Sequence, residues 1–338
     1  MGVDIAGILE KKTIGLEELK GTRLAVDAYN TIYQFVSAIR QPDGRPLSDS
    51  NGRPTSHLIG LLHRNVRLLG AGIRPFYVFD GIPSRLKSAT LEKRKQVKIR
   101  AEEKYREAVQ RQDMARAYSY AMQTTRLTEE MIVESMRMLE LLGIPYMTAP
   151  ADGEAQASQM ASRGDVWAVA SQDFDSLLYG APRLVRNLSL SGRRKMPGRR
   201  EFREVEIEML ELEPNLKRLG ISREQLVDIA ILVGTDFNEG VKGIGAKKGL
   251  AAVKKNGRIE STSYIEVLGT DTLSQVRQTF LNAEFVSEYQ LTWKKPDEHA
   301  LVEFLCEEHE FSKENVEETL AQLKNSSVST QQSLDSWN

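Results

Sequence analysis

The sequence predicts an α/β fold in which a central, mostly parallel sheet is flanked by helices. Three short apolar segments are typical of buried strands: Arg23 to Asp27, Pro75 to Asp80, and Val166 to Ala170. The first two end in an acidic residue, and Asp173 follows the third. Between the first two, apolar residues at helical spacing from Ser56 to Gly70 predict a crossover helix. A strand, a helix and a second strand in this order form a βαβ unit, which favours parallel strands.

Composition limits the class of protein. With 338 residues, 41% of them hydrophobic, the chain can bury a large core as one domain or two closely packed ones. We expect no membrane span and no signal peptide, because no apolar run reaches eighteen residues and the amino terminus has no basic segment before a hydrophobic one. The single cysteine, Cys306, excludes an internal disulfide. The net charge of −1 hides strongly segregated clusters of both signs.

The acids after the predicted strands indicate a site. Asp27 and Asp80 end two strands, and Asp173 and Asp175 follow the third. Ligands of open α/β sheets gather at the carboxyl ends of parallel strands. Carboxylates that converge there repel one another by roughly 4 kcal/mol per close pair, and cations relieve this repulsion. The alternative is an ordinary loop in which Asp175 starts the helix from Ser176 to Tyr179.

A basic insertion follows Asp80. The stretch from Arg85 to Arg100 holds seven basic residues and one acid, and the charged, helix-favouring sequence continues to about Arg126. This pattern fits a solvated helical pair. Its place directly after a site carboxylate favours a cover over the site that binds phosphate.

Two more acids precede a helix. An amphipathic helix with a capped start at Thr128 is expected to end at Leu142, before Gly143, and a short strand from Ile144 to Met147 follows it. Asp152 and Glu154 then lie in the first turn of another helix. Helix capping alone explains both residues, so a role in the site depends on the other acids.

The second half of the chain carries two basic elements. Gly192 to Arg200 predicts a hairpin whose Pro-Gly tip is flanked by Arg193, Arg194 and Lys195. A capping box at Ser222 begins a helix that ends near Val233, before Asp236. Gly243 and Gly245 then precede a helix with Lys247 and Lys248. Bare backbone N–H groups and lysines at a helix start indicate phosphate binding that is independent of base sequence.

Together these segments resemble the flap endonucleases, the structure-specific 5′ nucleases of replication and repair, and most closely those of archaeal type. The resemblance covers nearly the whole chain. It rests on Met1-Gly2-Val3, Val26-Asp27-Ala28, Val78-Phe79-Asp80-Gly81, Ala149-Pro150, Asp173-Phe174-Asp175, Gly234-Thr235-Asp236, Gly243-Ile244-Gly245 and a sliding-clamp motif at the end of the chain. The chain departs from the pattern at Asp152, where the family usually has glutamate.

The resemblance implies a 5′-nuclease fold related to PIN domains, with a helical arch over the site and a helix-hairpin-helix element that holds duplex DNA. It implies two Mg²⁺ ions, for which Mn²⁺ substitutes, among seven acids: Asp27, Asp80, Asp152, Glu154, Asp173, Asp175 and Asp236. Mg²⁺ prefers oxygen ligands. Lys87 and Arg94 match the arch residues that contact the scissile phosphate, and Tyr33 matches the aromatic residue that stacks a DNA base. Gly2 is expected close to the acids.

The expected activity is cleavage of 5′ DNA flaps, with 5′–3′ exonuclease activity, in Okazaki-fragment processing and repair. A non-catalytic DNA-junction binder recruited by the clamp is the alternative. The expected partners are branched DNA with a 5′ flap and the sliding clamp (PCNA), which binds Gln331, Leu334 and Trp337 after a polar tether. We expect a monomer in an archaeal cytoplasm, associated with the nucleoid, or in a nucleus if the source is eukaryotic.

The expected organisation has five parts. A nuclease region covers 1–98, the remainder of the arch covers 99–127, and a second nuclease region with the helix-hairpin-helix element covers 128–258. A helical part of the same globule covers 259–323, and the tail covers 324–338 with the clamp motif in 331–338.

Overall fold

The structure is a computed structural model that describes residues 2–41, 43–189, 192–195 and 202–323. For residues 85, 89, 91, 93 and 94, and for residues 192–195 and 202–204, it describes the backbone only. The clamp motif and its tether therefore lie outside the described residues. Among the described residues, no helix is long and apolar enough to cross a membrane.

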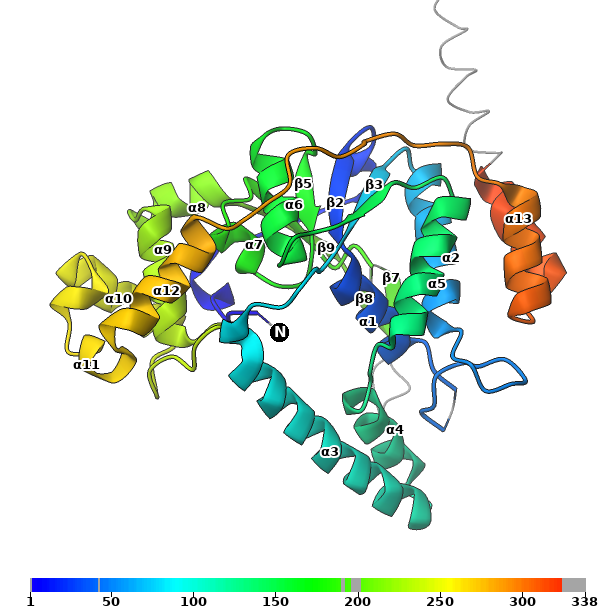
Figure 1. Ribbon diagram of the computed structural model, residues 1–338, viewed down its shortest axis with the longest axis horizontal. Helices are drawn as coiled ribbons and strands as arrows, with labels where there is room; N and C mark the ends of the chain where they lie inside the picture. Colours follow the sequence, from blue (N-terminus) through cyan, green and yellow to red (C-terminus); the bar gives the residue numbers. More distant parts are fainter. Residues whose placement is uncertain (1, 42, 190–191, 196–201, 324–338) are drawn as a thin grey trace, which may run out of the picture.

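A seven-stranded mixed sheet forms the centre of the molecule (Figure 1), with the strand order β1-β9-β6-β5-β2-β3-β4. The five strands from β6 to β4 are parallel, whereas β9, near one edge, pairs antiparallel with both β6 and β1. This confirms the predicted fold class. The strands are β1 (Lys12–Ile14), β2 (Arg23–Asp27), β3 (Arg74–Phe79), β4 (Tyr146–Thr148), β5 (Ala168–Ala170), β6 (Arg183–Arg186) and β9 (Ile207–Glu211).

Helices cover both faces of the sheet because alternate strand residues point to opposite sides. On β2, Leu24 and Val26 pack with α1 (Ala28–Ala38), α2 (Ser56–Gly70) and α5 (Glu129–Leu141) on one face. Ala25 packs with α6 (Gly153–Ser162) on the other face. The predicted crossover helix has the bounds of α2, and Thr128 caps α5 as expected, since its hydroxyl accepts the Met131 N–H at 3.2 Å.

The predicted basic cover is a helical pair that projects from the sheet (Figure 1). It consists of a short 3₁₀ turn, Arg85–Lys87, the long helix α3 (Ser88–Gln110) and α4 (Met114–Gln123). Lys87 is the N-cap of α3, so it lies at the base of the arch rather than within the helix. We call α3 and α4 the arch.

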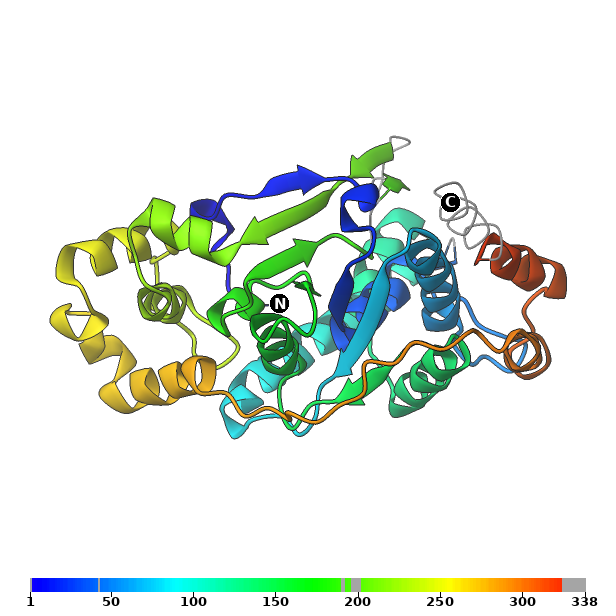
Figure 2. The same cartoon turned by 90° about the horizontal axis from the view of Figure 1, so that it is seen from above.

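A second group of helices packs together at one end of the molecule (Figure 2). It contains α7 (Asp175–Leu178), α8 (Leu212–Leu219), α9 (Arg223–Val233), α10 (Ala246–Asn256), α11 (Ile265–Leu268), α12 (Thr270–Leu281) and the 3₁₀ turn Ile259–Ser261. The capping box at Ser222 is present, with both of its hydrogen bonds. The predicted basic hairpin appears as the antiparallel strands β7 (Gly192–Lys195) and β8 (Phe202–Val205), while its Pro-Gly tip lies outside the described residues.

The segment predicted as one C-terminal helical part is divided between the two ends of the molecule. Residues 259–281 belong to the helices around α9, and an extended strand-like segment, 282–297, runs across the sheet to the opposite end (Figure 1). There α13 (Glu298–Val302), a π-helical turn (Glu303–Glu308) and a helix that begins at residue 313 pack against α2 and α5.

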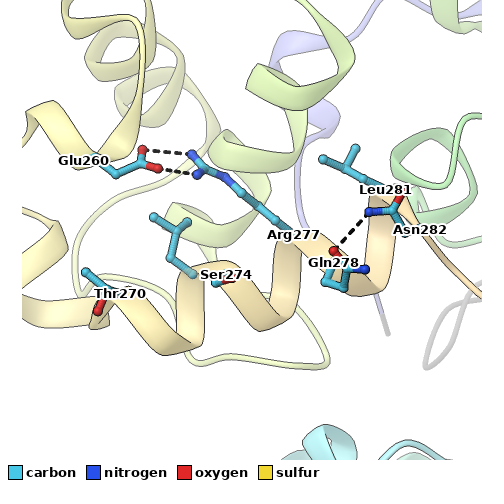
Figure 3. Close-up of a pocket in the computed structure, with 8 residues that line it drawn as sticks. Glu260, Thr270, Ser274, Arg277, Gln278, Leu281 and Asn282 are labelled. Atoms are coloured by element: carbon cyan, nitrogen blue, oxygen red, sulfur yellow. Dashed lines mark hydrogen bonds and ion pairs between the residues drawn. The ribbon is translucent and has the colours of Figure 1, made fainter.

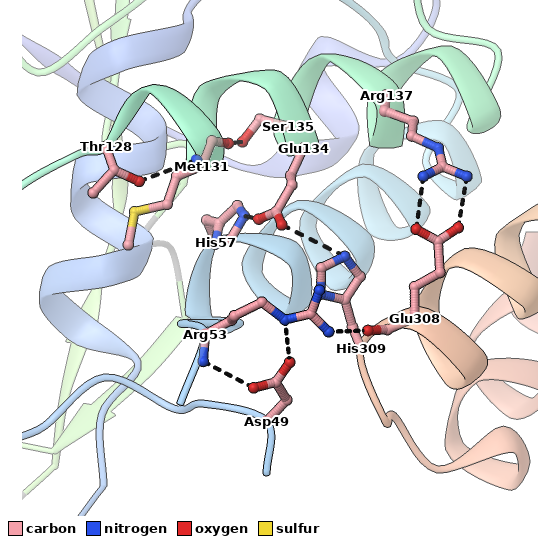
Figure 4. A network of polar contacts seen from close by, with 10 residues as sticks. All are labelled: Asp49, Arg53, His57, Thr128, Met131, Glu134, Ser135, Arg137, Glu308 and His309. Carbon is pink, nitrogen blue, oxygen red and sulfur yellow. Dashed lines mark hydrogen bonds and ion pairs between the residues drawn. The ribbon is translucent and has the colours of Figure 1, made fainter. Parts of the chain in front are cut away.

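A buried polar network joins this end to α2 and α5 (Figure 4). Glu134 on α5 accepts from His57 Nε2 at 2.9 Å and lies 3.7 Å from His309 Nε2, and both rings are buried. Nearby, Arg137 binds both carboxylate oxygens of Glu308. Two of the four histidines thus serve the packing of the C-terminal helices.

Candidate active site

The seven predicted acids come together at the carboxyl ends of the parallel strands. Asp27 ends β2, Asp80 follows β3, and Asp173 and Asp175 follow β5. Asp152 and Glu154 begin α6, and Asp236 follows α9. Their effects on one another show that they are close: Asp80, Asp173 and Asp152 each raise the pKa of Asp27, and Asp236 raises the pKa values of Asp80 and Asp175.

Burial adds to this repulsion. Asp27, Glu154 and Asp175 are each at least nine-tenths buried. Burial first, and then the neighbouring Asp80, raises the pKa of Asp27 well above its ordinary value. Burial and then Asp175 do the same for Glu154. Burial raises the pKa of Asp175 to about 7, although a backbone hydrogen bond from Val3 opposes the change. Without a cation, the site therefore resists full ionisation at neutral pH.

Backbone amides and small side chains hold the carboxylates in place. The Val3 N–H donates to Asp175 Oδ1 at 2.9 Å, and the Gly153 N–H donates to Asp80 Oδ1 at 2.7 Å. Asp27 caps α1 by accepting the Asn30 N–H at 3.0 Å. Each bond favours the anion, so these donors offset part of the repulsion.

Four side chains that sequence reasoning missed complete this shell. Ser171 donates to Asp27 Oδ2 at 3.2 Å, and Ser176 donates to Glu154 Oε1 at 3.4 Å. Asn30 donates to Asp173 Oδ2 at 3.3 Å, and Tyr179 donates to Asp152 Oδ2 at 3.1 Å. Ser171 and Ser176 flank Asp173 and Asp175 in the sequence, which was an available signal. The Tyr179 contact joins residues 27 positions apart and becomes visible only in the fold.

Lys87 places a positive charge among the acids. Its Nζ lies 2.5 Å from Asp152 Oδ2 and 5.2 Å from the centre of the Phe237 ring. Burial lowers the pKa of Lys87, but the attraction of Asp152 and its hydrogen bond outweigh burial, and the pKa is raised overall. The lysine is therefore a fixed cation at the base of the arch. For Arg94, the structure describes only a position on α3 and not the side chain.

The predicted stacking residue lies beside the arch. Tyr33, on α1, is 36% exposed, so it is not part of the core. Lys98 of α3 places its Nζ 5.7 Å from the centre of the Tyr33 ring. The ring is thus accessible and close to a cation of the arch.

The glycine-rich hairpin with Gly243 and Gly245 lies between α9 and α10. Gly245 is the N-cap of α10, and Gly243 has φ of +81°, a conformation that glycine adopts readily. Lys247 and Lys248 are exposed. Nearby, Arg277 on α12 binds Asp228 of α9, and it also binds Glu260 (Figure 3). Arg193, Arg194 and Lys195 are described by backbone alone.

The donor set fits hard divalent cations. All seven acids offer oxygen ligands, and the raised pKa values of Asp27, Asp80, Glu154 and Asp175 show a deficit of positive charge that such ions would correct. Within the described part of the chain, however, no three acidic, histidine or cysteine side chains are already arranged as a metal site.

The chain matches two known protein families. Residues 1–101 match the XPG N-terminal domain, and residues 143–236 match the XPG I-region. A flap endonuclease 1 from Thermococcus onnurineus is 49% identical over 339 residues, which cover 100% of this chain and 99% of the relative.

Two solved structures have the same fold. The flap endonuclease-1 of Methanococcus jannaschii is 38% identical with a TM-score of 0.76, over 97% of this chain and 100% of that one. The catalytic core of Rad2 in complex with DNA substrate is 25% identical with a TM-score of 0.69, over 93% of this chain and 96% of that one. The chain therefore belongs to the flap endonuclease 1 family and is a nuclease of that family.

Proposed function

We propose that this enzyme hydrolyses a phosphodiester bond at the base of a 5′ DNA flap, with a 5′–3′ exonuclease activity at the same site. The observation that carries the proposal is the cluster of seven carboxylates at one sheet edge, with Lys87 at the arch base placed among them. The Rad2 core, a structural relative, was solved with a DNA substrate. DNA between the arch and the sheet edge would bring a phosphate to these residues.

The acids would hold two Mg²⁺ ions, or Mn²⁺ in their place. Such ions supply a hydroxide near neutral pH and neutralise the developing charge on the phosphate oxygens. Asp27, Asp80, Glu154, Asp173, Asp175 and Asp236 would contribute oxygen atoms, with Asp152 beside them. Lys87 would leave Asp152 and approach the scissile phosphate, where its charge stabilises the transition state. Arg94 would assist from the same helix.

The remaining DNA contacts follow from position. Tyr33 would stack a base near the cleavage point, because its ring is exposed beside Lys98 of the arch. Gly243 and Gly245 would present backbone N–H groups to a phosphate of the duplex, with Lys247 and Lys248 adding charge. The basic hairpin with Arg193, Arg194 and Lys195 would contact the backbone as well.

Substitution of a single acid tests this function. Asp173→Ala should abolish cleavage of a flap substrate in Mg²⁺, while the affinity for the same substrate in Ca²⁺ stays within about threefold, because loss of one acid weakens ion binding and also reduces repulsion of phosphates. Asp271→Ala, at an exposed acid on α12, is the matched control and should cleave normally. Chelation of the metal should stop the wild type. Loss of DNA affinity in parallel with activity would contradict the assignment.

We propose further that the tail binds the sliding clamp (PCNA). The support lies in the sequence: Gln331, Leu334 and Trp337 are spaced by three, so one 3₁₀ turn brings the leucine and tryptophan together as an apolar plug. Deletion of 331–338 should leave flap cleavage by the isolated enzyme unchanged and abolish binding to the cognate clamp. Calorimetry of the truncated protein against the clamp measures this, and an undiminished affinity would place the interface elsewhere. An archaeal cell is the expected setting, since the relative from Thermococcus onnurineus is archaeal.

A further inference from the structure

The phenol hydroxyl of Tyr179 points into the acid cluster from a rigid position. The side chain is 7% exposed, and its ring centre lies 4.9 Å from that of Phe280 on α12. The backbone of Tyr179 is held on both sides, because its N–H donates to the Asp175 carbonyl at 3.0 Å and its carbonyl accepts from Arg223 Nη1 at 3.0 Å. The hydroxyl therefore has a fixed direction.

That direction is toward Asp152. The hydroxyl donates to Asp152 Oδ2 at 3.1 Å, and a buried phenol is costly without such a partner. The same oxygen accepts from Lys87 Nζ at 2.5 Å. The other oxygen, Oδ1, caps α6 by accepting the Glu154 N–H at 3.1 Å. Three donors from three separate elements thus fix both oxygens of one short carboxylate.

We propose that Tyr179 is a positioning residue of the active site, which holds Asp152 so that Oδ2 faces the base of the arch and receives Lys87. Tyr179 and Lys87 approach one oxygen from different elements, so the hydroxyl limits the directions in which the carboxylate can present itself to the lysine. In the absence of DNA, Lys87 therefore occupies a defined position beside Asp152. This inference rests on the proposed function, because it assigns Lys87 to the reaction.

Removal of the hydroxyl alone tests the proposal. Tyr179→Phe keeps the ring that packs against Phe280 and removes only the donor. We expect the single-turnover cleavage rate at saturating flap DNA and Mg²⁺ to fall about tenfold, the lower end of the range for lost partners of catalytic carboxylates. The affinity for flap DNA in Ca²⁺ should stay within about twofold. Tyr289→Phe is the matched control. Tyr289 lies on the segment 282–297, and the substitution likewise removes one hydrogen bond from a tyrosine to an aspartate, Asp165. The cleavage rate of this variant should equal that of the wild type.

The same substitution made in the Asp152→Asn enzyme distinguishes a positioning role of Tyr179 from a general loss of stability. If Tyr179 acts through Asp152, Tyr179→Phe should reduce the rate less than twofold further in the Asp152→Asn enzyme. A crystal structure of the DNA-free Tyr179→Phe protein should show Asp152 turned away from Lys87. The inference is overturned if Tyr179→Phe cleaves at the wild-type rate, if the loss is equally large in the Asp152→Asn background, or if the Lys87 contact is retained. None of these results would affect the proposed function, which the Asp173→Ala experiment tests separately.

Discussion

Removal of one buried charge from the acid cluster should make the metal-free enzyme more stable. Asp175 is 6% exposed, and burial together with Asp173 and Asp236 raises its pKa to about 7 from an ordinary value of 3.8. Asp175→Asn preserves the shape of the side chain, and the amide oxygen can still accept the Val3 N–H. The variant therefore loses the charge and little else.

The magnitude follows from the two pKa values. A carboxyl group whose pKa is raised in the folded state contributes stability at low pH, and this contribution is lost as the pH rises through the folded pKa, here about 7. Above that pH, the change from 3.8 to about 7 lowers the free energy of unfolding by about 4 kcal/mol. Because neighbouring acids share the released repulsion, we expect Asp175→Asn to gain about 2–4 kcal/mol at pH 8, or roughly 3–6 °C in Tm for a chain of this length. At pH 4 the gain should nearly vanish.

Thermal unfolding followed by circular dichroism, at pH 4 to 8 with chelator, measures this. Asp271→Asn, at an exposed acid, should show no such dependence on pH. Saturating Mg²⁺ should reverse the order, since ions that bind the folded wild type more tightly stabilise it more. A variant that is no more stable than the wild type at pH 8 in chelator would refute the reasoning, as would a gain that is the same at every pH.

Three further predictions concern Lys87 at the base of the arch, the two lysines at the start of α10, and Gly2 near the amino terminus. Lys87→Ala should slow the single-turnover rate about 10²- to 10³-fold while the DNA affinity in Ca²⁺ changes less than about threefold, because its charge acts on the transition state; equal losses would make Lys87 a binding residue. The double variant Lys247→Ala and Lys248→Ala should weaken binding of all DNA sequences alike and reduce the slope of log Kd against log salt by about 2, so a sequence-selective loss in a salt titration would contradict phosphate contact. Gly2→Ala should weaken Mn²⁺ binding about tenfold by calorimetry, because a Cβ there would lie 2.5 Å from Asp175 Oδ1; unchanged Mn²⁺ affinity would show that Asp175 adapts.

Local patterns in the sequence predicted the elements well. The strand Arg23 to Asp27, the helix Ser56 to Gly70 and the capping box at Ser222 have the expected bounds, since each depends on neighbouring residues. The strand expected from Val166 begins only at Ala168. One bond to the neighbouring strand precedes it, since the Trp167 N–H donates to the Arg23 carbonyl of β2 at 2.8 Å.

Contacts between distant elements escaped sequence reasoning. The seven acids could be predicted to lie together because each lies near a recognisable strand end or helix start. Tyr179 was not found, since a lone tyrosine after a short helix has no local mark of function. The division of residues 259–323 between two ends of the molecule also escaped prediction, because the extended segment 282–297 resembles an ordinary loop in composition.

The donors that hold the acids belong to distant parts of the chain, and this has a consequence for how the site assembles. Val3 at the amino terminus holds Asp175, Lys87 at the arch base holds Asp152, and Gly153 at the start of α6 holds Asp80. The backbone donors stay with their carboxylates, whereas Lys87 stands on a projecting helical pair and carries a full charge. Under the proposed function, departure of Lys87 toward a phosphate would leave one more unbalanced carboxylate beside Asp27, Glu154 and Asp175, whose pKa values are already raised. That departure is favourable only when positive charge takes its place, so occupation of the acids by cations and release of the lysine to DNA must reinforce each other.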